Sequence, residues 1–154
     1  MTDQVQETLV QVLESMLEQY AFAFCELAPK NELETEEVDF VHSLLTFTGS
    51  RTGEIALTMP AELCEEIAGN ILGGEMDNGE LSEYAQDSLK ELLNIYAGNV
   101  LTSLYGDEVS FDFDAPEIRN LDRIGWQSLI DDPLTIGVLV EDTPALLRFS
   151  ARES

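Results

Sequence analysis

The sequence has few basic residues, and this shortage limits the partners it can bind. It contains 7 Lys and Arg against 31 Asp and Glu in 154 residues, which gives a formal net charge of −24. A nucleic acid or an anionic lipid surface would meet long-range repulsion instead of the Lys and Arg contacts that release counterions. We therefore expect no nucleic-acid partner and no membrane partner, and the simplest role of the acidic charge is solubility.

The sequence is also poor in cysteine and histidine, the residues that most often bind metals or act as nucleophiles. Cys25 and Cys64 stand alone, with no CxxC or Cys/His spacing, and His42 is the only histidine. We expect both cysteines to be reduced core residues, His42 to be structural, and no metal to be bound by this chain. The acidic pairs at 112/114 and 131/132 lack the spacing of a calcium loop and are expected to be solvated.

No long hydrophobic segment is present. The N-terminus lacks a basic region before an apolar run, and no stretch approaches the ~18 uncharged apolar residues of a membrane span. We therefore expect a cytoplasmic protein. Its 44% apolar content and its length suit one globular domain over 1–154.

The first part of the chain predicts a helix and then a hairpin. Apolar residues recur every three or four positions from Gln4 to Leu27, as on one face of a long amphipathic helix, so we expect an N-terminal helix within 1–28. The acidic stretch 31–37 would be a solvated linker. Two segments rich in β-branched and aromatic residues then flank a glycine-containing turn, which predicts a β-hairpin over 38–59.

Two related helices are expected within 60–104. A helix over 60–72 would be stopped by the two glycines that follow it. After a turn at 77–79, Ser82 can cap a second helix that continues to Leu104 and ends at Gly106. An internal repeat joins the two helices, because the pattern Glu-Leu-x4-Ala-Gly-Asn recurs 29 residues later. We interpret it as a pseudo-twofold packing arrangement, not as two active sites.

Strand-like segments fill the C-terminal part, 109–151. They lie at 109–113, 134–140 and 146–151. Strands joined by such short turns cannot form parallel crossovers. The expected fold class is therefore α+β, a mainly antiparallel sheet packed on two similar helices, with the long N-terminal amphipathic helix added.

The second of the paired helices has an unusual outer face. At about 100° per residue, polar and small residues fall within roughly 60° of one another, opposite an apolar face. Apolar side chains flank this stripe, and a glycine within it would let a partner's backbone come close. The stripe consists of Asp87, Glu91, Asn94 and Gly98, the flanking residues are Tyr84, Ile95 and Leu101, and the apolar face consists of Leu89, Leu92, Leu93, Tyr96, Val100 and Leu104.

The stripe carries a motif that resembles a known family. Asp87-x3-Glu91-x2-Asn94, with Pro116 after 21 intervening residues, resembles the (D/S)-x3-E-x2-N signature and following proline of the CheC/CheX chemotaxis phosphatases. The likeness covers roughly 38–118. The first repeat has Glu65 at the position equivalent to Asn94, so the single motif resembles CheX more than the two-motif CheC. The segment 119–133 departs from the family pattern.

The resemblance implies a chemistry. Members of this family hydrolyse the aspartyl-phosphate of CheY-like response regulators; the motif glutamate pairs with a receiver lysine and the asparagine amide orients the attacking water. These roles would fall to Glu91 and Asn94. We expect partner-binding contacts from the neighbouring residues Asp87, Gly98, Ile95 and Tyr84. The family works with Mg²⁺ held by the phosphorylated receiver, so this chain would bind no cofactor itself.

Two other functions remain open. The same helix could recognise a receiver without catalysis, or the chain could be an interaction domain of the flagellar-switch type, which is related to the same fold. A homodimer is also expected, since sheet edges and the apolar face of the first helix need cover, and the resemblance points the same way.

Overall fold

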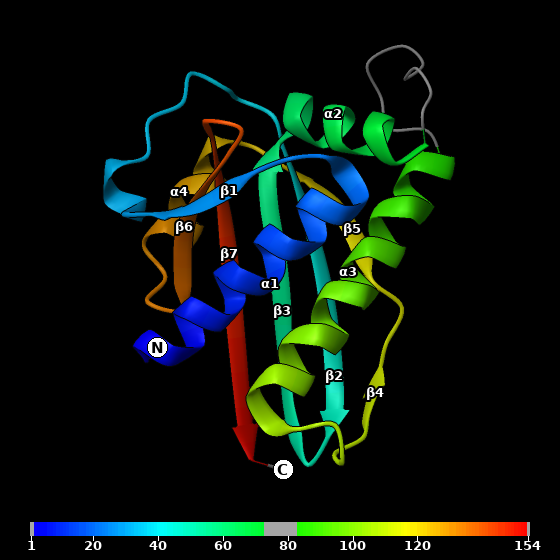
Figure 1. The fold of residues 1–154 in the computed structure, drawn as a ribbon. Helices are drawn as coiled ribbons and strands as arrows, with labels where there is room; N and C mark the ends of the chain where they lie inside the picture. Colours follow the sequence, from blue (N-terminus) through cyan, green and yellow to red (C-terminus); the bar gives the residue numbers. More distant parts are fainter. Residues whose placement is uncertain (1, 73–82, 154) are drawn as a thin grey trace.

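The computed structural model describes residues 2–72 and 83–153. In this part of the chain a seven-stranded antiparallel sheet has the order β1-β6-β7-β3-β2-β4, and β5 also pairs with β2 (Figure 1). The expected α+β class is confirmed. The strands are β1 (Cys25–Ala28), β2 (Phe40–Gly49), β3 (Arg51–Pro60), β4 (Phe111–Phe113), β5 (Glu117–Leu121), β6 (Thr135–Val140) and β7 (Thr143–Glu153), and the helices are α1 (Asp3–Ala21), α2 (Ala61–Leu72), α3 (Glu83–Tyr105) and α4 (Arg123–Ile130), with a 3₁₀ turn at Lys30–Glu32.

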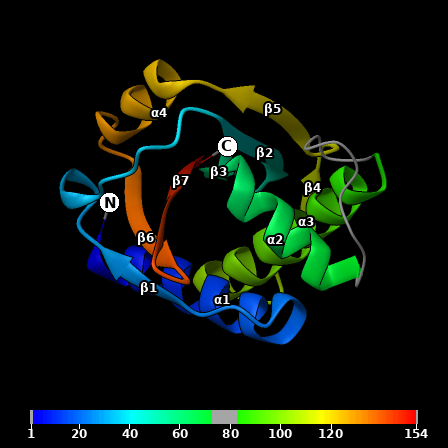
Figure 2. The same cartoon turned by 90° about the horizontal axis from the view of Figure 1, so that it is seen from above.

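The sheet is curved and is covered on both sides (Figure 2). α1, α2 and α3 lie on one side, and α4 lies on the other. The larger core forms between the first three helices and the sheet. A smaller cluster of Phe40, Trp126, Ile130 and Leu146 lies under α4, where the rings of Phe40 and Trp126 stack with centroids 4.3 Å apart.

The predicted hairpin is confirmed and lies at the centre of the sheet. β2 and β3 pair from Phe40 opposite Pro60 to Phe47 opposite Gly53. β7 approaches the other edge of β3 so closely that a Cβ at Gly53 would lie 1.8 Å from the Ser150 carbonyl oxygen. Glycine is therefore required where these two strands meet.

The N-terminal helix is shorter than the 1–28 expected from periodicity. It begins after Thr2, whose side-chain oxygen accepts a hydrogen bond from the Val5 amide, and it ends at Ala21. Phe22 adopts a left-handed conformation with φ 55°, which turns the chain out of the helix. The next residues form β1, which pairs with β6. The prediction was wrong here because the pairing partner of β1 lies more than a hundred residues away in the sequence.

The helix predictions agree with the structure where it is described. α2 begins at Ala61, directly after β3, and α3 ends at Tyr105, before Gly106 with φ +90°. The glycine stop at 73–74, the turn at 77–79 and the Ser82 cap lie outside the described residues.

The three C-terminal strands were expected, but β5 and α4 were missed. The Asp122 carboxylate accepts a hydrogen bond from the Gly125 amide at 2.9 Å and caps α4. Asp132, expected to be solvated, is half-buried and receives a hydrogen bond from Arg148 Nε at 2.7 Å. Arg148 also pairs with Glu54. The prediction failed because the cation comes from β7, 16 residues further along the chain.

Candidate functional site

α3 carries the candidate site on a helix that is firmly packed on its other face. Leu89, Leu92, Leu93, Tyr96 and Val100 are all buried, as the periodicity predicted. The Tyr96 hydroxyl donates a hydrogen bond to the Leu9 carbonyl at 2.8 Å, which links α3 to α1 inside the core. Burial holds the pKa of Tyr96 well above its ordinary value, so the phenol remains a donor.

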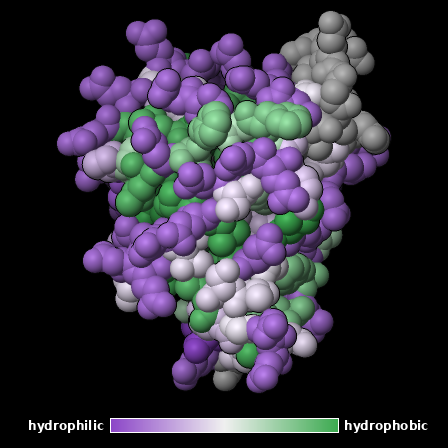
Figure 3. Space-filling view, viewed as in Figure 1, coloured by the Kyte–Doolittle hydropathy of each residue, from purple (hydrophilic) through white to green (hydrophobic). Residues whose placement is uncertain are grey.

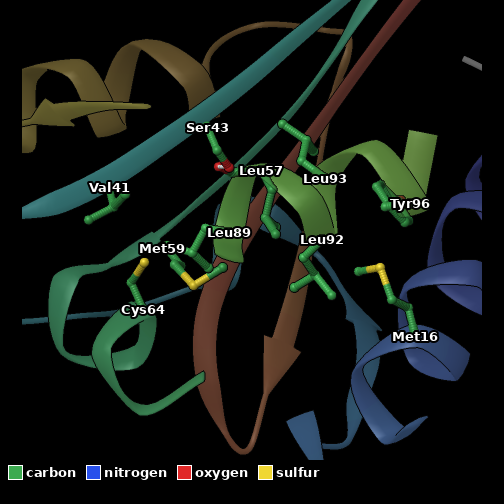
Figure 4. A pocket seen from close by; sticks show the side chains of 10 residues that line it. All are labelled: Met16, Val41, Ser43, Leu57, Met59, Cys64, Leu89, Leu92, Leu93 and Tyr96. Carbon is green, nitrogen blue, oxygen red and sulfur yellow. Dashed lines mark hydrogen bonds between the residues drawn. The ribbon is translucent and has the colours of Figure 1, made fainter. Parts of the chain in front are cut away.

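A small cavity lies beneath α3, but it is not a ligand site. Its volume is about 10 Å³, enough for one water molecule at most. Side chains from α1, α2, α3 and the hairpin point into it (Figure 4). They are almost entirely apolar, with Ser43 as the polar exception: Met16, Val41, Ser43, Leu57, Met59, Cys64, Leu89, Leu92, Leu93 and Tyr96.

The opposite face of α3 presents the predicted stripe to solvent. Asp87 and Glu91 are exposed, while Asn94 and Gly98 are half-buried. The stripe extends about 16 Å along the helix axis. Among the described residues, neither Glu91 nor Asn94 has a side-chain hydrogen bond or an ion pair within the chain. A carboxylate and an amide one turn apart are therefore available to a partner.

Gly98 has no structural reason to lack a side chain. A Cβ placed there meets no atom of the described residues within 4 Å. Glycine inside a helix costs about 0.5–1 kcal/mol relative to alanine, so the position sacrifices stability without any packing benefit inside this chain. The open surface at Gly98 instead allows another molecule to approach the helix backbone beside Asn94.

The apolar residues that flank the stripe differ from one another. Ile95 is half-buried at the border of the stripe and packs against the main core. Leu101 was expected to be exposed but is only 2% exposed, because it packs into the main core. Tyr84 occupies the second position of α3, and its side chain lies outside the described residues.

The motif proline directly precedes a strand that contacts α3. Pro116 is buried in the connection between β4 and β5. Thr46 of β2 holds this connection from two sides: its carbonyl accepts from the Asp114 amide at 3.0 Å and its hydroxyl donates to the Asp114 carboxylate at 2.7 Å. β5 in turn contacts α3. The strand that follows Pro116 thus lies beside the motif helix.

The other chemically reactive residues do not join the site. Both cysteines are free and buried, and burial raises the pKa of each thiol to about 12, so neither is an activated nucleophile. His42 is partly buried on β2 with Nδ1 2.6 Å from the Thr58 hydroxyl, and burial, with Arg119 nearby, lowers its pKa. Within residues 2–72 and 83–153, no three His, Cys, Asp or Glu side chains gather as a metal site, and no helix is long and apolar enough to cross a membrane.

Comparison with known proteins identifies a matching family. The family model described as "Chemotaxis phosphatase CheX" matches residues 41–125, more than half of the chain and the whole of the α3 motif. No curated protein sequence matches significantly.

Solved structures share the fold at low sequence identity. CheX from Vibrio vulnificus is 16% identical, with 97% of each chain covered and a TM-score of 0.71. CheX from Borrelia burgdorferi, solved in a complex with CheY, BeF3 and Mg²⁺, is 20% identical, with 97% of this chain and 98% of that chain covered and a TM-score of 0.65. FliY from Thermotoga maritima is 14% identical, with 100% of this chain and 92% of that chain covered and a TM-score of 0.58.

Proposed function

Because the chain belongs to the CheX family of chemotaxis phosphatases, we propose that it hydrolyses the aspartyl-phosphate of a CheY-like response regulator in the cytoplasm. The observation that carries the proposal is the pair formed by Glu91 and Asn94. Both lie on the solvent side of a helix whose other face is anchored in the core, and neither is engaged within the described chain. Side chains held on a rigid element can enter a partner's active site with little loss of conformational freedom.

Asn94 is the proposed water-orienting residue. Its amide offers both a donor and an acceptor, so it can hold a water molecule in line with phosphorus without acting as a base. The water oxygen bonds to phosphorus as the bond from phosphorus to the aspartate oxygen breaks. The products are the free aspartate carboxylate, inorganic phosphate and a proton. Catalysis of this kind depends mainly on positioning.

Glu91 is the proposed anchor. A carboxylate can accept a charge-assisted hydrogen bond from a receiver lysine, which is stronger than a neutral hydrogen bond. Glu91 is one helical turn from Asn94 on the same face, so a single docking event places both side chains. Asp87, Gly98, Ile95 and Tyr84 are proposed to contact the receiver around this pair.

The metal in this reaction is proposed to belong to the partner. The Borrelia CheX complex contains CheY, BeF3 and Mg²⁺ together. Carboxylates of a receiver domain would hold the Mg²⁺ and neutralise the phosphoryl oxygens. This chain would then supply Glu91 and Asn94 and no metal ligand.

We also propose that the protein is a homodimer. β1 is an edge strand of the sheet, and the exposed side chains of Phe22, Phe24 and Leu27 lie on it or just before it. An apolar edge of this kind is normally covered. Light scattering at micromolar concentration is expected to give twice the chain mass of 17.1 kDa, and a monomer mass would contradict the proposal.

A non-catalytic role is the second candidate. The fold is shared with FliY of Thermotoga maritima, and a shared fold does not by itself establish catalysis. A docking module using the same stripe would bind a phosphorylated receiver without accelerating loss of its phosphoryl group.

The test is the decay of phosphorylated receiver domains with Mg²⁺, alone and with the wild type, Asn94→Ala or Glu91→Ala. The proposal predicts faster decay with the wild type, loss of most acceleration in Asn94→Ala, and weaker binding in Glu91→Ala. Ser128→Ala on α4 is the matched control, because this exposed residue lies on the other side of the sheet. Undiminished acceleration by Asn94→Ala would overturn the mechanism, and binding without acceleration would establish the docking module.

A further inference from the structure

A groove runs between α1 and α3 on the face that also carries the stripe. Its volume is about 390 Å³, and it opens to solvent. In Figure 3, pale surface lies where α1 and α3 run beside each other, between purple and green patches. The groove is lined by amides, hydroxyls and apolar groups: Gln11, Val12, Ser15, Met16, Gln19, Tyr20, Asn99, Thr102 and Ser103.

None of these nine described residues carries a charge, although the chain has 31 acidic residues. A surface composed for solubility is roughly 25–35% charged, which would put two or three charged side chains among nine. On α3, no charged residue occurs from Asn94 to Tyr105. On α1, the acidic residues Glu14 and Glu18 do not line the groove but lie beyond Gln11, at about 60° and 20° from it around the helix. Glu7 lies about 40° beyond Gln11, near one end, and accepts a hydrogen bond from Gln11 at 3.1 Å.

The other surfaces beside the stripe carry charged residues, most of them acidic, with Lys90 and Arg119 as cations. Figure 1 shows α1 along one side of α3, β4 and β5 along the other, and α2 near its N-terminal end. Exposed carboxylates on the β4 and β5 side belong to Asp112, Asp114 and Glu117, although Glu117 pairs with Arg119. α2 exposes Glu62 and Glu66. Among the described residues, the groove is the surface beside Glu91 and Asn94 whose lining carries no charge.

Resting on the proposed function, we propose that this α1–α3 groove is the surface over which the receiver domain docks once its phosphorylated site lies on Asn94. A receiver's Mg²⁺ pocket is built from carboxylates, so acidic flanks would repel it and an uncharged flank would not. A standard interface buries ~800 Å² on each partner and is roughly 30 Å across. Ser103 lies only about 13 Å along α3 from Asn94, so the groove falls within such a footprint.

The experiment places a negative charge in the groove without altering the stripe. Ser103→Glu on α3 and Ser15→Glu on α1 are both at exposed positions. Ser103→Gln has the same size as the glutamate variant without its charge, and Ser128→Glu on α4 adds the same charge on the far side of the sheet. KM and kcat are measured for decay of a receiver phosphorylated by a small-molecule acyl phosphate, and binding is measured in parallel.

We expect Ser103→Glu and Ser15→Glu to raise KM roughly tenfold with kcat within about twofold of the wild type. Ser103→Gln and Ser128→Glu should change KM by less than about threefold. The increase in KM should become smaller as the salt concentration is raised.

Equal KM values for the wild type and both groove variants would overturn the proposal that the receiver docks over the groove. They would leave the proposed function intact, since the wild type would still be a phosphatase. If the wild type binds a receiver without catalysis, the Kd values of the same variants are compared, and equal Kd values overturn the docking proposal. If the wild type binds no receiver, both proposals fail.

Discussion

Removing the buried hydroxyl that joins α1 to α3 tests how the site is held in place. Tyr96 is 0% exposed, and its hydroxyl donates to the Leu9 carbonyl at 2.8 Å. Tyr96→Phe removes this hydrogen bond and leaves the ring, so little cavity forms. The net value of such a bond is about 1 kcal/mol, and the variant should lose about that much free energy of unfolding.

Urea denaturation measures the loss. With an m value of about 2 kcal/mol/M, a loss of 1 kcal/mol lowers the midpoint by about 0.5 M. Tyr105→Phe is the matched control. In the described part of the chain its hydroxyl has no hydrogen-bond partner, and Arg51 stacks on its ring at 4.4 Å, a contact that phenylalanine keeps. We expect the control to stay within about 0.3 kcal/mol of the wild type.

Two results would refute this account of the anchor. One is a Tyr96→Phe variant as stable as the wild type, which would mean that the hydrogen bond contributes nothing. The other is an equal loss in Tyr105→Phe, which would mean that the effect belongs to tyrosine hydroxyls in general and not to the contact between α1 and α3.

Three further changes have expected outcomes. Gly98→Ala should leave the free energy of unfolding unchanged or raise it by about 0.5–1 kcal/mol, while raising KM for a phosphorylated receiver; an unchanged KM would remove Gly98 from the interface. Trp126→Ala should cost about 3–5 kcal/mol in thermal or urea unfolding because it removes the stack on Phe40, and a loss under 1 kcal/mol would contradict that packing. Asp132→Asn should destabilise the protein near neutral pH. The hydrogen bond from Arg148 holds the pKa of Asp132 below its ordinary 3.8. The ionised Asp132 therefore adds to the free energy of unfolding above about pH 4, and this contribution disappears as the pH falls through the folded-state pKa. If the free energies of unfolding of the variant and the wild type differ by a constant amount down to pH ~3, this assignment is refuted.

Local patterns in the sequence were sufficient to predict the central elements of the fold. The hairpin formed by β2 and β3 and the buried face of α3 were readable because each depends on residues close together in the chain. The stripe of Asp87, Glu91, Asn94 and Gly98 was predicted by the same periodicity. The proposed roles of Glu91 and Asn94 came from the family resemblance, because periodicity cannot distinguish a catalytic face from a solvated one.

The missed features depend on contacts between distant parts of the chain. β1 exists because Cys25 pairs with Val140, and no local pattern shows that partner. Leu101 is buried because the main core extends over a position that a helical wheel assigned to the border of the stripe. α4 had a local signal in the Asp122 cap that was overlooked. The groove could not be predicted, since it exists only where α1 and α3 lie side by side.

The most direct test of the central claim is the rate of phosphoryl loss from one receiver domain at saturating concentrations of the wild type and of Asn94→Ala. Saturation separates positioning of the water from binding. The account predicts a wild-type rate well above that of the receiver alone, and an Asn94→Ala rate close to the receiver's own while the complex still forms. An Asn94→Ala rate equal to the wild type would contradict the claim that this amide orients the attacking water.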